Sequence, residues 1–123
     1  MNLTVVPGML AICRLDQDAP VPHWAQTSRF FSITRTAHEL SVVCAQDAVP
    51  AGVRHRGGWR CLCVQGPLDF ALTGILESLA APLAGAGIPI FAISTYDTDV
   101  ILVQDTDLER AREALECAGH QVA

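Results

Sequence analysis

Short apolar segments in the second half of the chain alternate with polar ones. Residues 59–64 are apolar except for Arg60, and Gly66 and Pro67 follow them, which predicts a buried or half-buried strand followed by a turn. Residues 89–94 and 100–103 predict two more strands with a polar turn between them. The 100–103 segment is apolar throughout, so we expect that strand in the centre of a sheet.

Apolar residues at helical spacing occupy the two longer gaps between these segments. The first set predicts a helix whose first turn is capped by Asp69, with Pro82 disturbing its last turn. The second set predicts another helix. Thr106 and Glu109 stand at the spacing of a capping box, which predicts the start of this helix. With a last strand at 121–123, the predicted order is βαββαβ.

The first half of the chain repeats part of this pattern. A shift of sixty residues aligns residues 31–43 with 91–103, which indicates two tandem related units, with chance similarity between apolar hairpins as the alternative. Residues 3–6 and 9–15 predict two strands on either side of Pro7 and Gly8.

The first unit is expected to be the smaller of the two. Pro20 and Pro22 leave no room for a long helix in the first half, and residues 49–58 are expected to link the halves. The predicted division is therefore a reduced unit over 1–57 and a complete unit over 58–123.

Composition and charge argue against several classes of function. The chain has 8 basic and 13 acidic side chains, a formal net charge of −5, and 50% hydrophobic against 17% charged residues. This composition is too apolar for a disordered regulator and lacks the basic face that nucleic acids require. No apolar stretch has the length of a membrane span, so we expect a cytoplasmic protein, with surplus apolar surface for a homodimer.

The cysteines predict neither a disulfide framework nor a metal site. Cys61 and Cys63 would lie on one face of a strand, where a bond between them would be strained. No Cys-x-x-Cys pair is present and the four histidines are scattered, so no metal or cofactor is expected. Buried, reduced thiols are the favoured interpretation.

The segments GPLDFALTGIL (66–76) and ISTYDTDVILV (93–103) resemble the ACT-domain family. The likeness is to tandem ACT proteins related to aspartate-kinase regulatory domains and to the CASTOR arginine sensors. The first half matches through FFSITRT (30–36) and ELSVVC (39–44). The resemblance implies an α+β, ferredoxin-like ACT fold in tandem units, with an antiparallel sheet and helices on one face.

The resemblance also implies an amino-acid site where the turn after the first strand meets the turn between the second and third strands. Carried onto this chain, the ligand-binding residues are Leu68, Asp69, Phe70, Thr73, Gly74, Ile75, Ser94, Thr95, Tyr96, Asp97, Thr98 and Asp99. Amides at a helix start suit a carboxylate, and Asp97 or Asp99 suits an ammonium group. Each residue also has an ordinary structural explanation: a helix cap for Asp69, a solvated turn for the other carboxylates, and a hairpin tip for Tyr96.

The two halves are not equivalent at this turn. Residues 37–39 are Ala-His-Glu, whereas residues 97–99 are Asp-Thr-Asp. If the acidic pair is needed for binding, one site per chain or per interface is expected.

The leading hypothesis is therefore a regulatory protein whose assembly, or whose partner enzyme, responds to a free amino acid. The alternative is a dimerisation or interaction module without a ligand. An enzyme built on Cys61 with a histidine, or on the carboxylates of 97–99, is not favoured, because no triad-like or phosphate-loop motif accompanies them.

Overall fold

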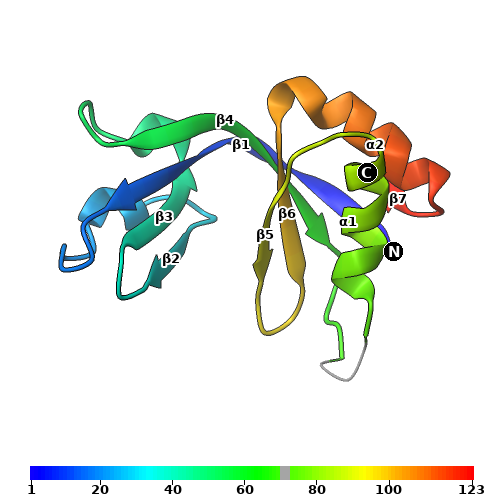
Figure 1. Ribbon diagram of the computed structural model, residues 1–123, viewed down its shortest axis with the longest axis horizontal. Coiled ribbons are helices and arrows are strands. Elements are labelled where there is room, and N and C mark those ends of the chain that lie inside the picture. The colour runs from blue at the N-terminus through cyan, green and yellow to red at the C-terminus, as the bar shows by residue number, and fades with distance from the viewer. Residues whose placement is uncertain (70–72) are drawn as a thin grey trace. The chain divides into compact units, whose positions relative to one another are not determined.

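The computed structural model describes residues 1–69 and 73–123, which form two compact units (Figure 1). One, here called the hairpin unit, is Gly8–Trp59, and the other, the helical unit, combines Met1–Pro7 with Arg60–Ala123. Strands β1 (Asn2–Leu15) and β4 (His55–Val64) contribute to both units. The predicted domains, 1–57 and 58–123, are continuous along the chain, whereas in space the first seven residues group with the last part of the chain. The division at residue 57 stays a prediction.

The helical unit has the predicted βαββαβ order, counted from β4. Its further elements are α1 (Ile75–Gly85), β5 (Phe91–Ser94), β6 (Asp99–Gln104), α2 (Leu108–Cys117) and β7 (Gln121–Val122). The strand order is β7-β1-β4-β6-β5, with β7 parallel to β1. Strand β1 is thus inserted between the first and last strands of the βαββαβ pattern, where a ferredoxin-like sheet would place them side by side.

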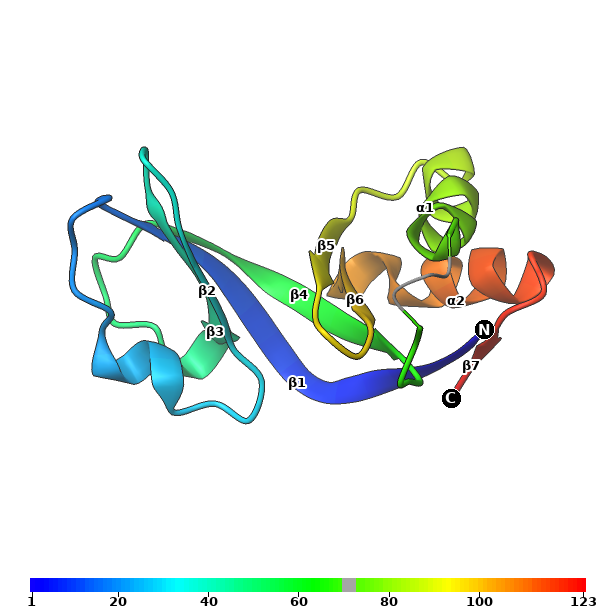
Figure 2. The same cartoon turned by 90° about the horizontal axis from the view of Figure 1, so that it is seen from below.

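Both helices cover one face of this sheet, as Figures 1 and 2 show. Alternate residues of β4 and β6 point toward the helices, as the period of a strand requires. The buried side chains of this core include Leu62, Val64, Ile101 and Val103 from the sheet and Leu79, Leu83, Ala111 and Leu115 from the helices. No helix in the described part of the chain has the length and apolarity to cross a membrane.

The hairpin unit has the same strand order without the helices. Its strands run β2-β3-β1-β4, where β2 is Ser32–Arg35 and β3 is Leu40–Ala45. Short 3₁₀ turns at His23–Gln26 and Gln46–Ala48 stand where the helical unit has α1 and α2. The reduced first unit is therefore confirmed, and its core contains small side chains such as Ala11, Cys13 and Cys44.

Both helix starts differ from the predictions. Helix α1 begins at Ile75, after Gly74 in a left-handed conformation (φ 74°), so Asp69 does not cap it. Helix α2 follows Asp107 without any side-chain cap, so the capping box predicted from Thr106 and Glu109 is wrong. Pro82 does lie inside α1, as expected.

Strand β1 is continuous, whereas two strands were predicted. The Pro7–Gly8 pair does not end it, and Gly8 takes a positive φ of 93° within the strand. The chain passes from the helical unit to the hairpin unit between these two residues. The turn signal therefore marks the point where a long strand changes units.

The hairpins of the two units correspond with a shift of 59 residues, one less than the sequence alignment indicated. Thr36 N–H donates to the Glu39 carbonyl over 2.9 Å, and Thr95 N–H donates to the Thr98 carbonyl over 2.8 Å. A shift of one residue exchanges the two faces of a strand. The repeat is therefore real in architecture, but its sequence alignment is out of register by one.

The cysteines in the core are expected to resist alkylation. Burial raises the pKa of Cys13 and that of Cys61 from 9.0 to about 12, so both stay protonated near neutral pH. Cys117 is exposed. Iodoacetamide at pH 8 should therefore modify Cys117 first, and mass spectrometry should find all five cysteines modified only after denaturation.

The same shifts predict loss of stability in alkali. The unfolded thiols ionise near pH 9 while the folded ones do not, so the free energy of unfolding should fall as the pH rises above about 9. Rapid iodoacetamide labelling of Cys13 or Cys61 in the folded protein would contradict the raised pKa values of these two thiols.

Candidate functional site

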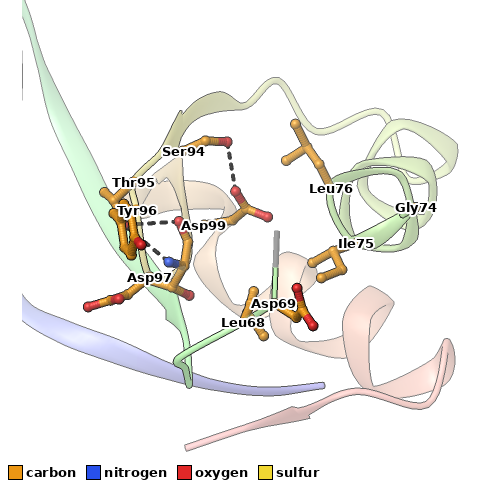
Figure 3. Close-up of a pocket in the computed structure, with 11 residues that line it drawn as sticks. Leu68, Asp69, Gly74, Ile75, Leu76, Ser94, Thr95, Tyr96, Asp97 and Asp99 are labelled. Atoms are coloured by element: carbon orange, nitrogen blue, oxygen red, sulfur yellow. Dashed lines mark hydrogen bonds between the residues drawn. The ribbon is translucent and has the colours of Figure 1, made fainter. Parts of the chain in front are cut away.

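A cavity of about 300 Å³ lies between the start of α1 and the β5–β6 hairpin (Figure 3). It is lined by Leu68, Asp69, Gly74, Ile75, Leu76, Ser94, Thr95, Tyr96, Asp97, Thr98 and Asp99. Ten of these residues belong to the predicted ligand-binding set. Their common position at one cavity is a structural fact, while their role in binding stays a prediction.

The remaining two predicted residues do not contribute. Thr73 is exposed and does not line the cavity, and Phe70 lies outside the residues that the structure describes. Leu76 lines the cavity but was not predicted. A helix start after Gly74, whose lack of a side chain permits the left-handed cap, would have placed Leu76 in the first turn.

The turn of the β5–β6 hairpin is held by three hydrogen bonds. The Thr95 N–H and its hydroxyl both donate to the Thr98 carbonyl, over 2.8 and 3.0 Å. The Thr98 N–H donates back to Thr95 Oγ1 over 3.2 Å. This side of the cavity is therefore preorganised without a ligand.

The same turn is anchored to the segment that follows β4. The Leu68 N–H donates to the Asp97 carbonyl over 2.6 Å, and Thr98 Oγ1 donates to the Val64 carbonyl over 2.6 Å. Gly66 lies against this contact, and a Cβ added there would stand 2.9 Å from the Asp97 carbonyl oxygen. The close approach explains why a residue without a side chain occupies this position.

Gly66→Ala is expected to destabilise the protein by about 1–3 kcal/mol, because the new methyl group forces the two segments apart. The unfolding midpoint in urea measures this loss. Gly85→Ala is the matched control, since its added Cβ meets nothing within 4 Å at the end of α1. Equal stability of the two variants would show that the contact at Gly66 does not hold the turn.

Asp99 is the carboxylate best placed to meet a ligand. It is half-buried, and Ser94 Oγ donates to its Oδ1 over 2.7 Å. In Figure 3 its carboxylate points into the space before α1, while Tyr96 and Asp97 turn away. Asp69 lies beside Ile75 on the opposite side of that space. Asp97 instead contributes its backbone carbonyl to the anchoring of the turn.

The electrostatic field around the cavity is negative. The helical unit contains three arginines against nine carboxylates, a formal net charge of −6, whereas five arginines and four carboxylates give the hairpin unit +1. The three arginines already have acidic partners: Arg60 with Asp105, Arg110 with Asp107 and Arg112 with Glu109. A cationic group is therefore attracted to this unit.

The hairpin unit lacks the corresponding carboxylate. With the structural shift of 59 residues, Leu40 stands where Asp99 stands in the helical unit, and its side chain is fully buried. This difference supports one site per chain. Among the described residues, no three His, Cys, Asp or Glu side chains gather as they would around a metal ion.

Two curated relatives share about a third of their aligned residues with this chain. CASTOR3P of Homo sapiens is 32% identical over 93 residues, and the cytosolic arginine sensor for mTORC1 subunit 1 of Bos taurus is 31% identical over 91. Both alignments cover 65% of this chain, but only 57% and 28% of the respective relatives.

Solved structures extend the likeness to the whole chain. Protein Atu0741 from Agrobacterium tumefaciens superimposes with a TM-score of 0.94 at 43% identity, over 99% of this chain and 91% of that one. The regulatory subunit of aspartate kinase from Thermus thermophilus has the same fold, with a TM-score of 0.66 at 12% identity over 95% and 96% of the two chains.

Both parts of the chain match known family models. Residues 8–52 match a family of N-terminal domains, and residues 54–117 match the ACT domain. The ACT match spans more than half of the chain and includes every residue that lines the cavity described above. The chain belongs to the ACT-domain family.

Proposed function

We propose that the chain is a regulatory protein that binds one free amino acid with a cationic side chain in the cavity between α1 and the β5–β6 hairpin. The observation that carries this proposal is the carboxylate of Asp99, which faces the first turn of α1 across the cavity. The side-chain cation and the α-carboxylate of the ligand thus have partners on opposite walls, while Asp69, beside the start of α1, suits the neighbouring α-ammonium group.

The α-carboxylate of the ligand is matched by the start of α1. The first-turn amides of an α-helix have no acceptor within the helix, and they carry the positive end of the helix dipole. The first helical bond here runs from the Ser78 N–H to the Gly74 carbonyl over 2.9 Å. The amides of Ile75 and Leu76, both at the cavity, are therefore suited to a carboxylate.

The cationic groups of the ligand are matched by Asp99 and Asp69. A carboxylate that bonds an ammonium or guanidinium group forms a charge-assisted hydrogen bond, about twice as strong as a neutral one. The cavity volume of about 300 Å³ lies at the small end of ligand pockets, which suits a single amino acid. The name of the bovine relative, an arginine sensor, makes L-arginine the first ligand to test.

Regulation would follow from binding at a surface that other chains can reach. Leu76 and Tyr96 line the cavity and are 38% and 80% exposed, so a ligand there would alter what a neighbouring chain meets. We propose a cytoplasmic homodimer or a partner enzyme as the responding assembly. The same exposure favours the alternative function, a ligand-free interaction module.

Thermal-shift titration against the twenty amino acids tests the proposal. L-arginine and L-lysine should raise the unfolding temperature at millimolar concentration, because a ligand at 100 times its Kd adds about 2.7 kcal/mol to the stability of the folded state. Stabilisation by L-glutamate equal to that by L-arginine, or no stabilisation by any amino acid, would refute it. Light scattering with and without arginine distinguishes the ligand-free module, whose assembly would not change.

A further inference from the structure

Helix α1 contains a backbone carbonyl that the helix itself cannot satisfy. The Ser78 carbonyl would normally accept from the N–H four residues later, but that residue is Pro82, which has no N–H. A carbonyl left without a donor inside a folded unit destabilises it unless another group provides the bond.

His120 provides that bond. Its Nε2 lies 2.9 Å from the Ser78 carbonyl oxygen, and because a carbonyl can only accept, Nε2 carries the proton. The other ring nitrogen, Nδ1, then accepts from the Met1 nitrogen over 3.1 Å. His120 is only 9% exposed, and its N–H donates to the Leu115 carbonyl near the end of α2.

Ser78 connects this bond directly to the candidate site. Its N–H donates to the Gly74 carbonyl over 2.9 Å, and its Oγ donates to the Ile75 carbonyl over 2.7 Å. Gly74 and Ile75 both line the cavity. One residue therefore separates the histidine from the helix turn whose residues line the cavity.

We propose that His120 is a positioning residue for the ligand cavity: it replaces the helical bond that Pro82 removes and so fixes the first turn of α1. This inference rests on the proposed function for its effect on binding, but the bond itself can be tested without a ligand. The bond from His120 thereby connects the cavity wall to the segment between α2 and β7.

Two substitutions separate the two ring contacts. His120→Gln keeps an N–H donor near the position of Nε2, while His120→Asn keeps a polar group near Nδ1 and loses the bond to Ser78. The Kd for L-arginine, measured by calorimetry, should rise about tenfold in His120→Asn and stay within about twofold of wild type in His120→Gln, as expected for the loss of one part-buried hydrogen bond.

Pro82→Ala makes the test specific. Alanine restores the N–H that can bond the Ser78 carbonyl, so His120→Asn in the Pro82→Ala background should change the Kd by less than about twofold. A purely structural role of His120 would give the same loss in both backgrounds. Equal losses, or an equal defect in His120→Gln and His120→Asn, would overturn the proposal.

Hydrogen exchange gives a readout that needs no ligand. Exchange of the Ser78 amide should be about tenfold faster in His120→Asn than in wild type, and Pro82→Ala should abolish that difference. If wild type binds no amino acid but the exchange result holds, only the proposed function fails. If the Ser78 amide exchanges at an unchanged rate in His120→Asn, the positioning role fails whatever the ligand result.

Discussion

Asp99→Asn is expected to weaken the binding of L-arginine by roughly 10- to 100-fold, because it removes the half-buried carboxylate that we propose to bond the cationic group. Asparagine has the same shape, and its carbonyl oxygen can still accept from Ser94 Oγ, which donates to Asp99 over 2.7 Å in the native protein. The unfolding temperature should therefore stay near that of wild type. Isothermal titration calorimetry measures the change in Kd.

Glu116→Gln is the matched control for this prediction. It removes one negative charge from an exposed position of α2 that does not line the cavity. Any effect of net charge alone should appear equally in both variants, and we expect the Kd of Glu116→Gln to stay within about twofold of wild type. Equal weakening in the two variants would mean that Asp99 acts only through the overall charge.

Leu79→Ala is expected to lower the free energy of unfolding by about 2–5 kcal/mol, the largest stability effect that we predict. Leu79 is fully buried where α1 packs on the sheet, in the same core cluster as Leu83 and Ile101. Truncation removes the transfer energy of the side chain and leaves a void that rigid strands cannot fill. The midpoint of urea unfolding should fall with an unchanged slope.

Leu76→Ala provides the comparison on the same helix. Leu76 is 38% exposed, so the same substitution should cost less than about 1 kcal/mol of stability. The contrast between the two leucines tests which face of α1 contacts the sheet. Similar losses at both positions would contradict the packing described here.

The sequence predicted the elements of the helical unit better than their ends. The strands and both helices occur where apolar periodicity placed them, because that periodicity reflects which side chains are buried. The cavity lies where the resemblance to ACT domains implied a binding site. Helix starts failed because Asp69 and Thr106 are suitable caps by type, while the actual start after Gly74 depends on a backbone conformation that periodicity does not report.

The register of the internal repeat could not be found from hydrophobicity. Most side chains of β3 and β6 are buried on both faces, so an alignment shifted by one residue still matches apolar with apolar. The hydrogen bonds of the turns and the pairing of the strands reveal the shift of 59 residues. This shift matters for function, because it makes buried Leu40 the counterpart of Asp99 and leaves the hairpin unit without an equivalent carboxylate.

The continuous strands were also hidden by ordinary turn signals. Pro7 and Gly8 normally end a strand, and so do Gly57 and Gly58. Here β1 passes between the units at Pro7 and Gly8, and β4 does so just after Gly58, which has a positive φ of 81°. Pairing with distant strands decides whether such a signal ends a strand or lets the strand pass from one unit to the other. The local sequence pattern carries no information about that pairing.

Binding of a cationic amino acid at this cavity is tested most directly by an NMR titration of the ¹⁵N-labelled chain with L-arginine. We expect saturable shifts of the amides of Ile75, Leu76 and Thr95, with the turn at Thr36 in the hairpin unit as an unshifted internal control. Absence of saturable shifts at millimolar arginine, or shifts confined to the hairpin unit, would contradict binding at this cavity.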